Sequence, residues 1–229
     1  MLFKEPKIEP AFERYRDLFE RIVEEEVQEL EKCGHSIGEG RTAKVKVSDV
    51  KDFICLKIID YRQVRKNSVN LTNKANEEME FLDKLSDIDF LKSIGINQRI
   101  VPRPMYSQNS SNFGFIFMQK ISGFTIKDWR EGGCKTEALP AGFNWKQYFD
   151  QLEDIINKLN NANIHHRDFH DGNIFVDDKG HPIIIDFGNA RETFLSDEDP
   201  YREDDFRGGT TVYSSDKKML SDIKKNILK

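Results

Sequence analysis

The chain has 229 residues, of which 38% are hydrophobic and 33% charged, a balance typical of a globular protein with one large domain or two small lobes. Its net charge of −5 disfavours a general binder of nucleic acids or anionic membranes. Three cysteines without paired spacing argue for a reducing compartment and against a disulfide framework. No apolar run approaches 18 residues and no basic-then-apolar leader opens the chain, so we expect a cytoplasmic protein without a membrane span.

The front half of the chain is expected to be mostly β. An amphipathic helix is predicted over residues 11–32, where apolar side chains recur on one face. That face suits packing on the domain, and contact with a partner or a second copy is left open. A loop with two glycines should join two strands within residues 35–47. The remaining front elements are a strand at 53–59, a helix at 72–87, a loop or edge segment at 101–106 and a strand at 113–121.

The back half is expected to be mostly α, which makes the fold class α+β. A long amphipathic helix is predicted over residues 145–163. A polar loop follows, then a strand at 174–176, a turn with the sequence DDKG, and a strand at 182–186. The segment 189–215 is acidic and rich in turn residues, and a helix is predicted at 219–228.

The glycine loop is the first candidate for chemistry. Gly38 and Gly40 lie in the stretch IGEGRTAKV, and glycines let exposed backbone N–H groups approach phosphates closely. A plain hairpin turn is the alternative. The stretch lacks the ending of a P-loop, and it precedes a strand rather than the helix of a dinucleotide-binding motif.

A lysine within an apolar strand is the second candidate. Lys57 stands in the stretch ICLKII, and burying an unpaired ammonium is unfavourable. The lysine therefore either reaches water at an edge or faces an anion. Glu77, Glu78 and Glu80 lie on the following helix, and one of them would pair with Lys57 and hold it toward a phosphate.

The stretch IHHRDFHDGNIFVDDKGHPIIIDFG at 164–188 combines carboxylates with apolar strands. Asp168 is suited to orient a hydroxyl and accept its proton. Asn173 and Asp186 offer the hard oxygen ligands that Mg²⁺ prefers. We expect Gly188, two residues after Asp186, to allow a sharp change of chain direction there.

Five motifs of this sequence resemble those of the protein-kinase superfamily, and they appear along the chain in the order found in that superfamily. The stretch HRDFHDGN at 166–173 resembles the catalytic loop, and DFG at 186–188 resembles the motif of that name. The glycine loop, Lys57 and Glu78 match the remaining three. The resemblance implies a two-lobed protein-kinase-like fold with a β-rich N-lobe and a reduced, α-rich C-lobe. The expected domains are an amphipathic extension at 1–34, the N-lobe at 35–121 and the C-lobe at 122–229.

The resemblance also implies roles for individual residues. Lys57 would contact the α- and β-phosphates of ATP, steadied by Glu78, and Asp168 would be the catalytic base. Asn173 and Asp186 would hold Mg²⁺. The other residues assigned to the nucleotide are Gly38, Gly40 and Val45 over the phosphates and adenine, Met118 as gatekeeper, and Gln119, Lys120 and Ile121 as the hinge. Asp216 would brace the catalytic loop, to which Arg167 also belongs.

The chain departs from the family pattern at four points. Ala43 replaces the third glycine, and no APE motif follows DFG. His170 stands where Ser/Thr protein kinases usually have lysine, as in the pattern of aminoglycoside and choline kinases. It is either a structural brace or a phosphate contact. The chain ends 13 residues after Asp216 (229 − 216), so we expect a minimal kinase similar to bacterial effector kinases or other compact kinases.

An acidic run at residues 197–205 invites a hypothesis about Arg167. In the family this arginine often pairs with a phosphate of the activation segment. Here a carboxylate such as Asp199 or Glu203 would replace that phosphate and make the protein active without phosphorylation. A solvated loop is the alternative.

The sequence as a whole predicts an ATP- and Mg²⁺-dependent phosphotransferase acting on Ser or Thr hydroxyls of an unidentified protein. A small-molecule kinase and a pseudokinase that binds without turnover are the alternatives. Expected partners include a protein substrate but no nucleic acid, and a partner or dimer contact through helix 11–32 stays possible. The compartment would be the bacterial cytoplasm, or the host cytosol for an injected effector.

Overall fold

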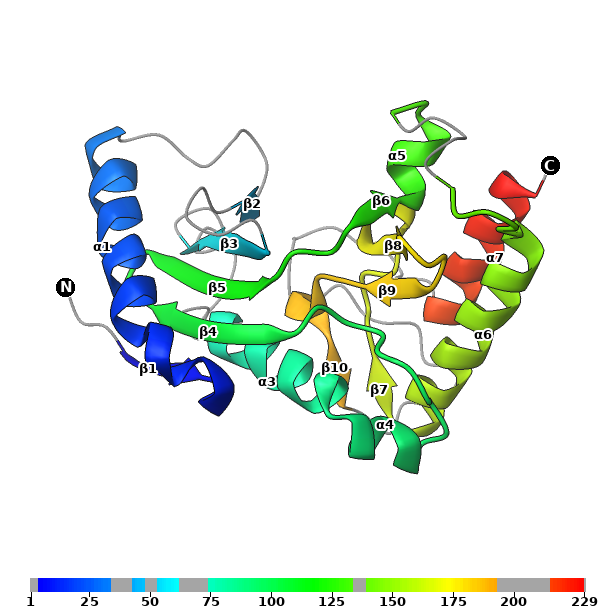
Figure 1. Ribbon diagram of the computed structural model, residues 1–229, viewed down its shortest axis with the longest axis horizontal. Coiled ribbons are helices and arrows are strands. Elements are labelled where there is room, and N and C mark those ends of the chain that lie inside the picture. Colours follow the sequence, from blue (N-terminus) through cyan, green and yellow to red (C-terminus); the bar gives the residue numbers. More distant parts are fainter. Residues whose placement is uncertain are drawn as a thin grey trace. The chain divides into compact units, whose positions relative to one another are not determined.

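The computed structural model describes residues 4–33, 43–47, 53–61, 74–133, 139–192 and 215–228. These residues form two compact units (Figure 1). The first contains the described residues up to Asp83 together with Arg103–Lys120, and the second contains Lys84–Pro102 and the described residues from Ile121 onward. Gly38, Gly40 and the acidic run at 197–205 lie outside the described residues.

A five-stranded antiparallel sheet in the order β1-β4-β5-β3-β2 organises the first unit. The strands are β1 (Lys4–Ile8), β2 (Ala43–Val47), β3 (Ile54–Asp60), β4 (Pro104–Asn109) and β5 (Phe113–Gln119). The prediction of a loop or edge segment at 101–106 is confirmed for residues 101–103 and wrong from Pro104 onward, because β4 pairs with β1 on one side and β5 on the other. The proline-rich sequence hid this strand, whose first residue, Pro104, stands where a ladder tolerates proline.

The two faces of this sheet differ in chemistry. Side chains alternate between faces along a strand, so Phe113, Phe115 and Phe117 of β5 share one face, while Ile116 and Met118 share the other. Helix α1 (Arg16–Cys33) packs on the phenylalanine face, and α3 (Lys74–Ser86) is joined by side-chain hydrogen bonds to the opposite one. The sheet is therefore covered by a helix on each face.

Helix α1 covers the phenylalanine face with its apolar stripe. Phe19 and Val23 are fully buried, and the Phe19 ring lies 4.7 Å from that of Phe117 and 5.3 Å from that of Tyr106, centroid to centroid. Each such buried side chain contributes about 1.5–3 kcal/mol. The expected helix is confirmed, with a 3₁₀ helix (Pro10–Tyr15) leading into it, and its apolar face packs on the domain. A partner contact through this helix stays a prediction, which its polar face would have to make.

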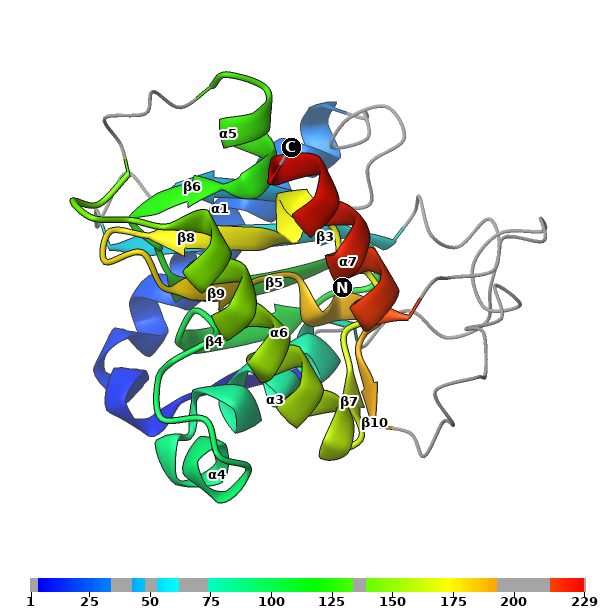
Figure 2. The ribbon, with the colours of Figure 1, turned by 90° about the vertical axis from the view of Figure 1, so that its right-hand side faces the viewer.

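The second unit is built around two adjoining helices, α6 (Trp145–Asn161) and α7 (Asp216–Ile227). Figure 2 shows α7 lying along α6, and Lys224 Nζ donates to Asp150 and Glu153 at 3.0 Å each. The strands are β6 (Gly123–Thr125), β7 (Ile164–His165), β8 (Ile174–Asp177), β9 (Pro182–Ile184) and β10 (Arg191–Glu192). The smaller helices are α4 (Ile88–Ser93), α5 (Ile126–Arg130) and two 3₁₀ helices, Asp171–Asn173 and Phe187–Asn189.

The predicted hairpin of the second unit is confirmed. Strands β8 and β9 pair antiparallel, with β6 on the far side of β8. Gly180 adopts a φ of 81° in the connecting turn, and its N–H donates to the Asp177 carbonyl at 3.0 Å. The hairpin anchors the loop that precedes it, because Asn173 ends a 3₁₀ helix and β8 starts at the next residue. Mixed helix and sheet, with a β-rich first unit, confirm the expected α+β class.

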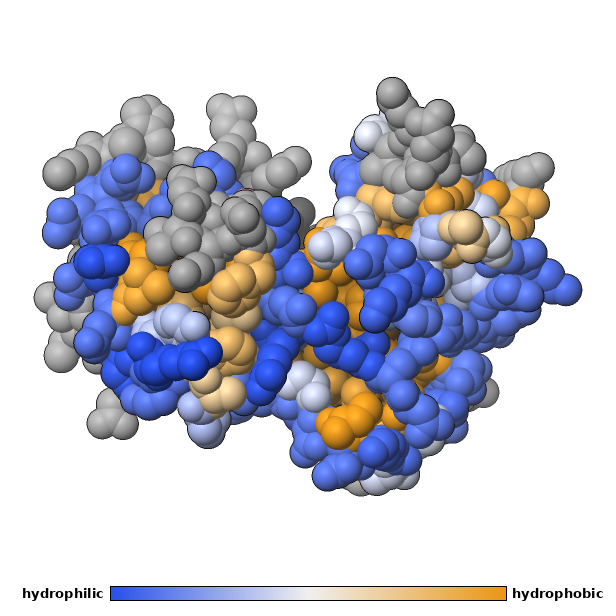
Figure 3. Space-filling model, viewed as in Figure 1, coloured by the Kyte–Doolittle hydropathy of each residue, from blue (hydrophilic) through white to orange (hydrophobic). Residues whose placement is uncertain are grey.

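On the face seen in Figure 3, the described residues are largely hydrophilic, with smaller hydrophobic areas between them. The large apolar residues that are well exposed lie apart in sequence: Val45, Phe53, Ile88 and Leu228. Scattered exposure of this kind is normal for a globular surface. Among the described helices, none combines the length and apolar character that crossing a bilayer requires.

Candidate functional site

A buried ion pair joins sheet and helix in the first unit. Lys57 of β3 donates from Nζ to both carboxylate oxygens of Glu78 on α3, at 2.6 and 2.9 Å. Lys57 is 4% exposed and Glu78 1%. Of the three candidate partners predicted from sequence, Glu78 is therefore the one that pairs with Lys57. Glu80 pairs with Lys7 of β1, and Glu77 is half-buried. Burying both charges is unfavourable unless they pair closely, as they do here.

Neutral hydrogen bonds hold α3 against the same face of the sheet. Ser107 Oγ of β4 donates to Asn76 Oδ1 at 2.9 Å. The Tyr61 hydroxyl donates to Asn109 Oδ1 and accepts from the Ala75 N–H at 3.2 Å. Removal of Tyr61 from water raises the pKa of its hydroxyl, which therefore stays a donor. These bonds fix the first turn of α3, and with it the position of Glu78.

The other nucleotide-binding candidates of the first unit share the face that carries Lys57. Val45 of β2 is directly opposite Lys57, and Met118 of β5 is directly opposite Cys55. Directly opposed residues of a ladder lie on one face, and Cys55 and Lys57 are two positions apart. Val45 is 58% exposed, so its apolar side chain has room for a ligand to cover it.

Two of the three hinge amides are already engaged. The Gln119 N–H donates to the Arg103 carbonyl and the Lys120 N–H to the Phe53 carbonyl, each at 2.8 Å. Neither N–H is therefore available to an adenine ring while the sheet is intact. The Gln119 carbonyl also accepts from the Cys55 thiol at 3.9 Å, so the hinge that binds adenine stays a prediction for the backbone of Ile121.

In the second unit, the loop that carries Asp168 is held from beneath by Asp216. The Asp216 carboxylate accepts hydrogen bonds from the His166 N–H at 2.8 Å and the Arg167 N–H at 3.0 Å. Asp216 is 1% exposed at the start of α7, where Ser215 caps the helix by accepting from the Lys218 N–H. The structure thus brings Asp216 to the place under the loop that the sequence predicts.

His166 orders the same loop through its ring. Its Nε2 lies 2.8 Å from the Ile185 carbonyl, and its Nδ1 lies 3.3 Å from the Asp168 N–H. A carbonyl only accepts and an amide only donates, so the ring carries its proton on Nε2. The rings of Phe169 and Phe187 contact it edge-on, at 5.7 and 4.7 Å between centroids. His166 therefore ties Asp168 to the segment that precedes Asp186.

Among the described residues, Asn189 and His170 lie near the Asp168 carboxylate. Asn189 Nδ2 donates to Oδ2 at 3.4 Å, and His170 Nε2 lies 4.0 Å from Oδ1. The His170 Nδ1 accepts the Gly172 N–H at 3.0 Å. His170 therefore caps the 3₁₀ helix, and its other nitrogen is turned toward Asp168. Contact of His170 with a phosphate stays a prediction. Asn189 is a residue that sequence reasoning missed, since no motif singles it out.

Asp186 occupies a strained backbone position. Its φ of 63° is left-handed, as is the 65° of Arg167, and such residues often mark functional sites. The expectation that Gly188 makes the turn is wrong, because the reversal occurs at Asp186 itself and Gly188 lies in the 3₁₀ helix Phe187–Asn189. Strand β9 accordingly ends at Ile184, two residues earlier than predicted.

The donor set of Asn173 and Asp186 fits a magnesium ion. Asn173 Nδ2 donates to the Asp168 carbonyl at 2.9 Å. This bond uses the amide nitrogen of Asn173 and not its oxygen, which is the atom that would bind Mg²⁺. The Ile185 N–H also donates to the Asn173 carbonyl at 3.0 Å, which ties the two segments together. Within the described residues, no three His, Cys, Asp or Glu side chains form a metal-binding group. Mg²⁺ does not need one, because it commonly takes one or two protein oxygens plus phosphates and water.

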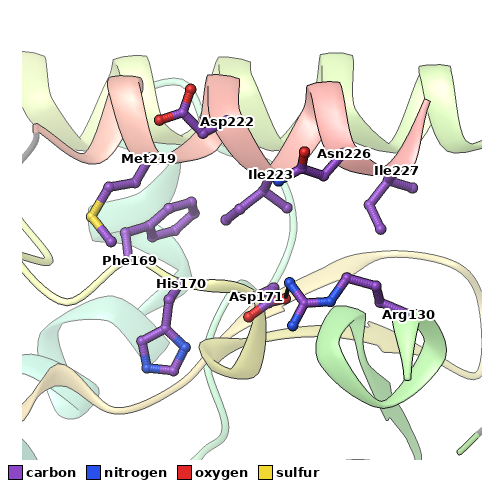
Figure 4. A pocket seen from close by; sticks show the side chains of 9 residues that line it. All are labelled: Arg130, Phe169, His170, Asp171, Met219, Asp222, Ile223, Asn226 and Ile227. Atoms are coloured by element: carbon purple, nitrogen blue, oxygen red, sulfur yellow. Dashed lines mark ion pairs between the residues drawn. The ribbon is translucent and has the colours of Figure 1, made fainter. Parts of the chain in front are cut away.

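A cavity of about 320 Å³ borders the loop that carries Asp168 in the second unit. Figure 4 shows Phe169 beside Met219 and Ile223 of α7, while Arg130 reaches toward Asp171 and forms an ion pair with it. Neither Asp168 nor Asn173 lines this cavity. It is therefore a neighbour of the candidate catalytic residues and not their site.

Parts of this chain are similar to known proteins. The family model "Protein kinase domain" matches residues 32–217. The chain is 28% identical over 159 residues to a CBL-interacting serine/threonine-protein kinase 21 of Arabidopsis thaliana, covering 68% of this chain and 34% of that protein. It thus spans about a third of the length of this curated relative. A crystal structure of WbdD superposes with a TM-score of 0.43 at 18% identity, covering 69% of this chain and 32% of the other.

Proposed function

Because the chain belongs to the protein kinase family, we propose that it transfers the γ-phosphoryl group of ATP to a hydroxyl, and that this hydroxyl belongs to a Ser or Thr of a protein. The observation that carries the proposal is the buried Lys57–Glu78 pair. A buried ion pair adds little to stability, whereas an oriented ammonium on a ligand-facing strand suits phosphate binding.

In this proposal Lys57 donates to the α- and β-phosphates, and Glu78 keeps its ammonium in place. Asn173 and Asp186 would hold Mg²⁺, which neutralises phosphate charge. Val45 and Met118 would contact adenine. The Ile121 backbone would bond its edge, since the Gln119 and Lys120 amides and the Gln119 carbonyl have other partners.

Asp168 would act on the acceptor. Its carboxylate orients the hydroxyl and takes its proton as the hydroxyl oxygen bonds to the γ-phosphorus. The bond from that phosphorus to the bridging oxygen breaks, and ADP leaves. Asp216, His166 and Asn189 hold Asp168 for this step through the hydrogen bonds described above. Arg167, which has a left-handed φ of 65°, lies in the same loop. The acidic run proposed to pair with Arg167 lies outside the described residues.

A protein acceptor is supported by the likeness to a Ser/Thr kinase. His170 supports the second candidate, a small-molecule acceptor, because it stands in the position that carries histidine in aminoglycoside-kinase-like patterns and turns Nε2 toward Asp168. A pseudokinase is the third candidate, and turnover separates it from the other two.

The test is transfer of labelled γ-phosphate in the presence of Mg²⁺, first to the protein itself and to generic acidic and basic protein substrates. Asp168→Asn should lower kcat by roughly 10²–10⁴, and Asp186→Ala should abolish transfer, with both variants folded by circular dichroism. Label on protein that vanishes in both variants supports the protein kinase. Label found only on added aminoglycosides or choline supports the second candidate. Nucleotide binding without any transfer would leave a pseudokinase.

A further inference from the structure

A partly buried ion pair joins α1 to β2 in the first unit. Lys46 Nζ donates to both carboxylate oxygens of Glu26, at 2.6 and 2.8 Å. The Lys46 side chain is 33% exposed and that of Glu26 only 16%. Two short charge-assisted bonds with limited solvent access make this contact more directional than a typical surface ion pair.

Among the described strands, β2 pairs with β3 alone, over five residues. The ion pair with α1 supplies a further attachment, at the position next to Val45.

The register places the ion pair behind the proposed nucleotide face. Lys46 is opposite Leu56, which lies in the core cluster that contains α1, whereas Val45 is opposite Lys57. Adjacent residues of a strand point to opposite faces. Glu26 therefore binds β2 on the face of the sheet that α1 covers. Val45 lies on the opposite face, beside Lys57.

The helix that carries Glu26 is packed on the sheet. Val23 and Val27, on the same stripe of α1 as Phe19, are buried against the sheet, and Glu26 lies between them in sequence. A side chain on a packed helix restrains its partner more than a side chain on a mobile loop does. The position of β2 is thus set by its contact with α1 as well as by its pairing with β3.

We propose that Glu26 and Lys46 are positioning residues for nucleotide binding, through which α1 holds β2 so that Val45 and Lys57 present one ordered surface. The inference rests on the proposed function, since it takes ATP to bind on that face. It adds a residue pair that lies away from the ligand and acts through Val45.

The test compares Glu26→Gln with Glu25→Gln, a matched change at the neighbouring, exposed position of the same helix. Equilibrium affinity for the magnesium complex of adenylyl imidodiphosphate is measured by calorimetry, and amide hydrogen exchange is followed at residues 43–47. Glu26→Gln should raise Kd about fivefold, the factor that corresponds to the upper range for ion pairs with partial exposure. Exchange in β2 should quicken, while Tm and the exchange of β5 stay unchanged.

The reversed pair Glu26→Lys with Lys46→Glu should restore affinity toward that of the unmodified chain. Equal Kd values for the two glutamine variants would overturn the inference, as would a Kd that stays constant while Tm falls, since that describes a purely structural contact. If the unmodified chain fails to bind the nucleotide at all, the proposed function itself fails. Faster exchange in β2 would then still show the mechanical link, without any role in binding.

Discussion

Lys57 and Glu78 share two hydrogen bonds of 2.6 and 2.9 Å while almost fully shielded from water. Removing one partner strands a buried charge, which costs about 3–5 kcal/mol, whereas replacing both by apolar groups is often neutral or stabilising. We therefore expect Lys57→Met to destabilise the protein strongly and the double variant Lys57→Met/Glu78→Met to recover that stability. Urea unfolding measures both.

The double variant should nevertheless lack phosphoryl transfer. Recovery of stability without recovery of transfer would show that the pair is kept for chemistry and not for the fold. The interpretation fails if the double variant is as unstable as Lys57→Met, because the pair would then be needed for packing.

Asp216 accepts two backbone hydrogen bonds, a buried one from His166 and a partly buried one from Arg167. Asp216→Ala should lower the free energy of unfolding by about 2–4 kcal/mol, since an unsatisfied buried donor costs about 1–3 kcal/mol. Asp222→Ala on the same helix is the control. Asp222 is exposed and contacts only a neighbouring lysine in the described contacts, so it should change stability by less than about 0.5 kcal/mol. Similar losses from both would rule out the bracing role.

Asp83 on α3 should make stability depend on pH. Burial, with Glu9 nearby, raises the pKa of its carboxyl from 3.8 to about 6, although Lys7 opposes the rise. The folded state then holds a proton that the unfolded chain releases, so the free energy of unfolding should fall as pH rises from about 4 to 6. Asp83→Asn should reduce this fall in the free energy of unfolding by about 1 kcal/mol, a modest value because solvent screens the group.

Thermal unfolding at several pH values measures this effect. Asp89→Asn, at an exposed position of α4, should leave the slope unchanged. A slope that survives in Asp83→Asn would assign the proton to a different carboxyl.

Cys55 should react slowly with alkylating reagents at neutral pH. Burial raises the pKa of its thiol from 9.0 to about 11, and only the thiolate is nucleophilic. In a background with Cys33→Ser and Cys134→Ser, the rate with iodoacetamide should rise about tenfold per pH unit from pH 7 to 10. A plateau near pH 9 would indicate an ordinary, solvated thiol.

The elements with strong periodicity were predictable from sequence, and those with mixed signals were not. The periodic apolar residues of α6 and the β-branched run of β3 correspond to elements within two residues of the expected bounds. β1 was missed because Pro6 breaks its pattern. It is an edge strand, where a missing N–H is tolerated.

The candidate site shows the same division. The pattern around Lys57 requires an anionic partner, yet spacing alone leaves Glu77, Glu78 and Glu80 open, and only the orientation of α3 chooses Glu78. Asp186 illustrates the opposite error. The glycine two residues later suggested the turn, but Asp186 itself is left-handed, next to Ile185, whose backbone bonds to His166 and Asn173. Such long-range restraint leaves no local signal.

Helix α1 also determines how this protein can be divided. The family model starts at residue 32, after almost the whole helix. A chain that begins at residue 32 and keeps every later residue would uncover the rings of Phe117 and Tyr106, which Phe19 now shields. Aromatic surface of that kind promotes aggregation. The family boundary is thus not a folding boundary here, and the shortened protein should be recovered mostly in the insoluble fraction.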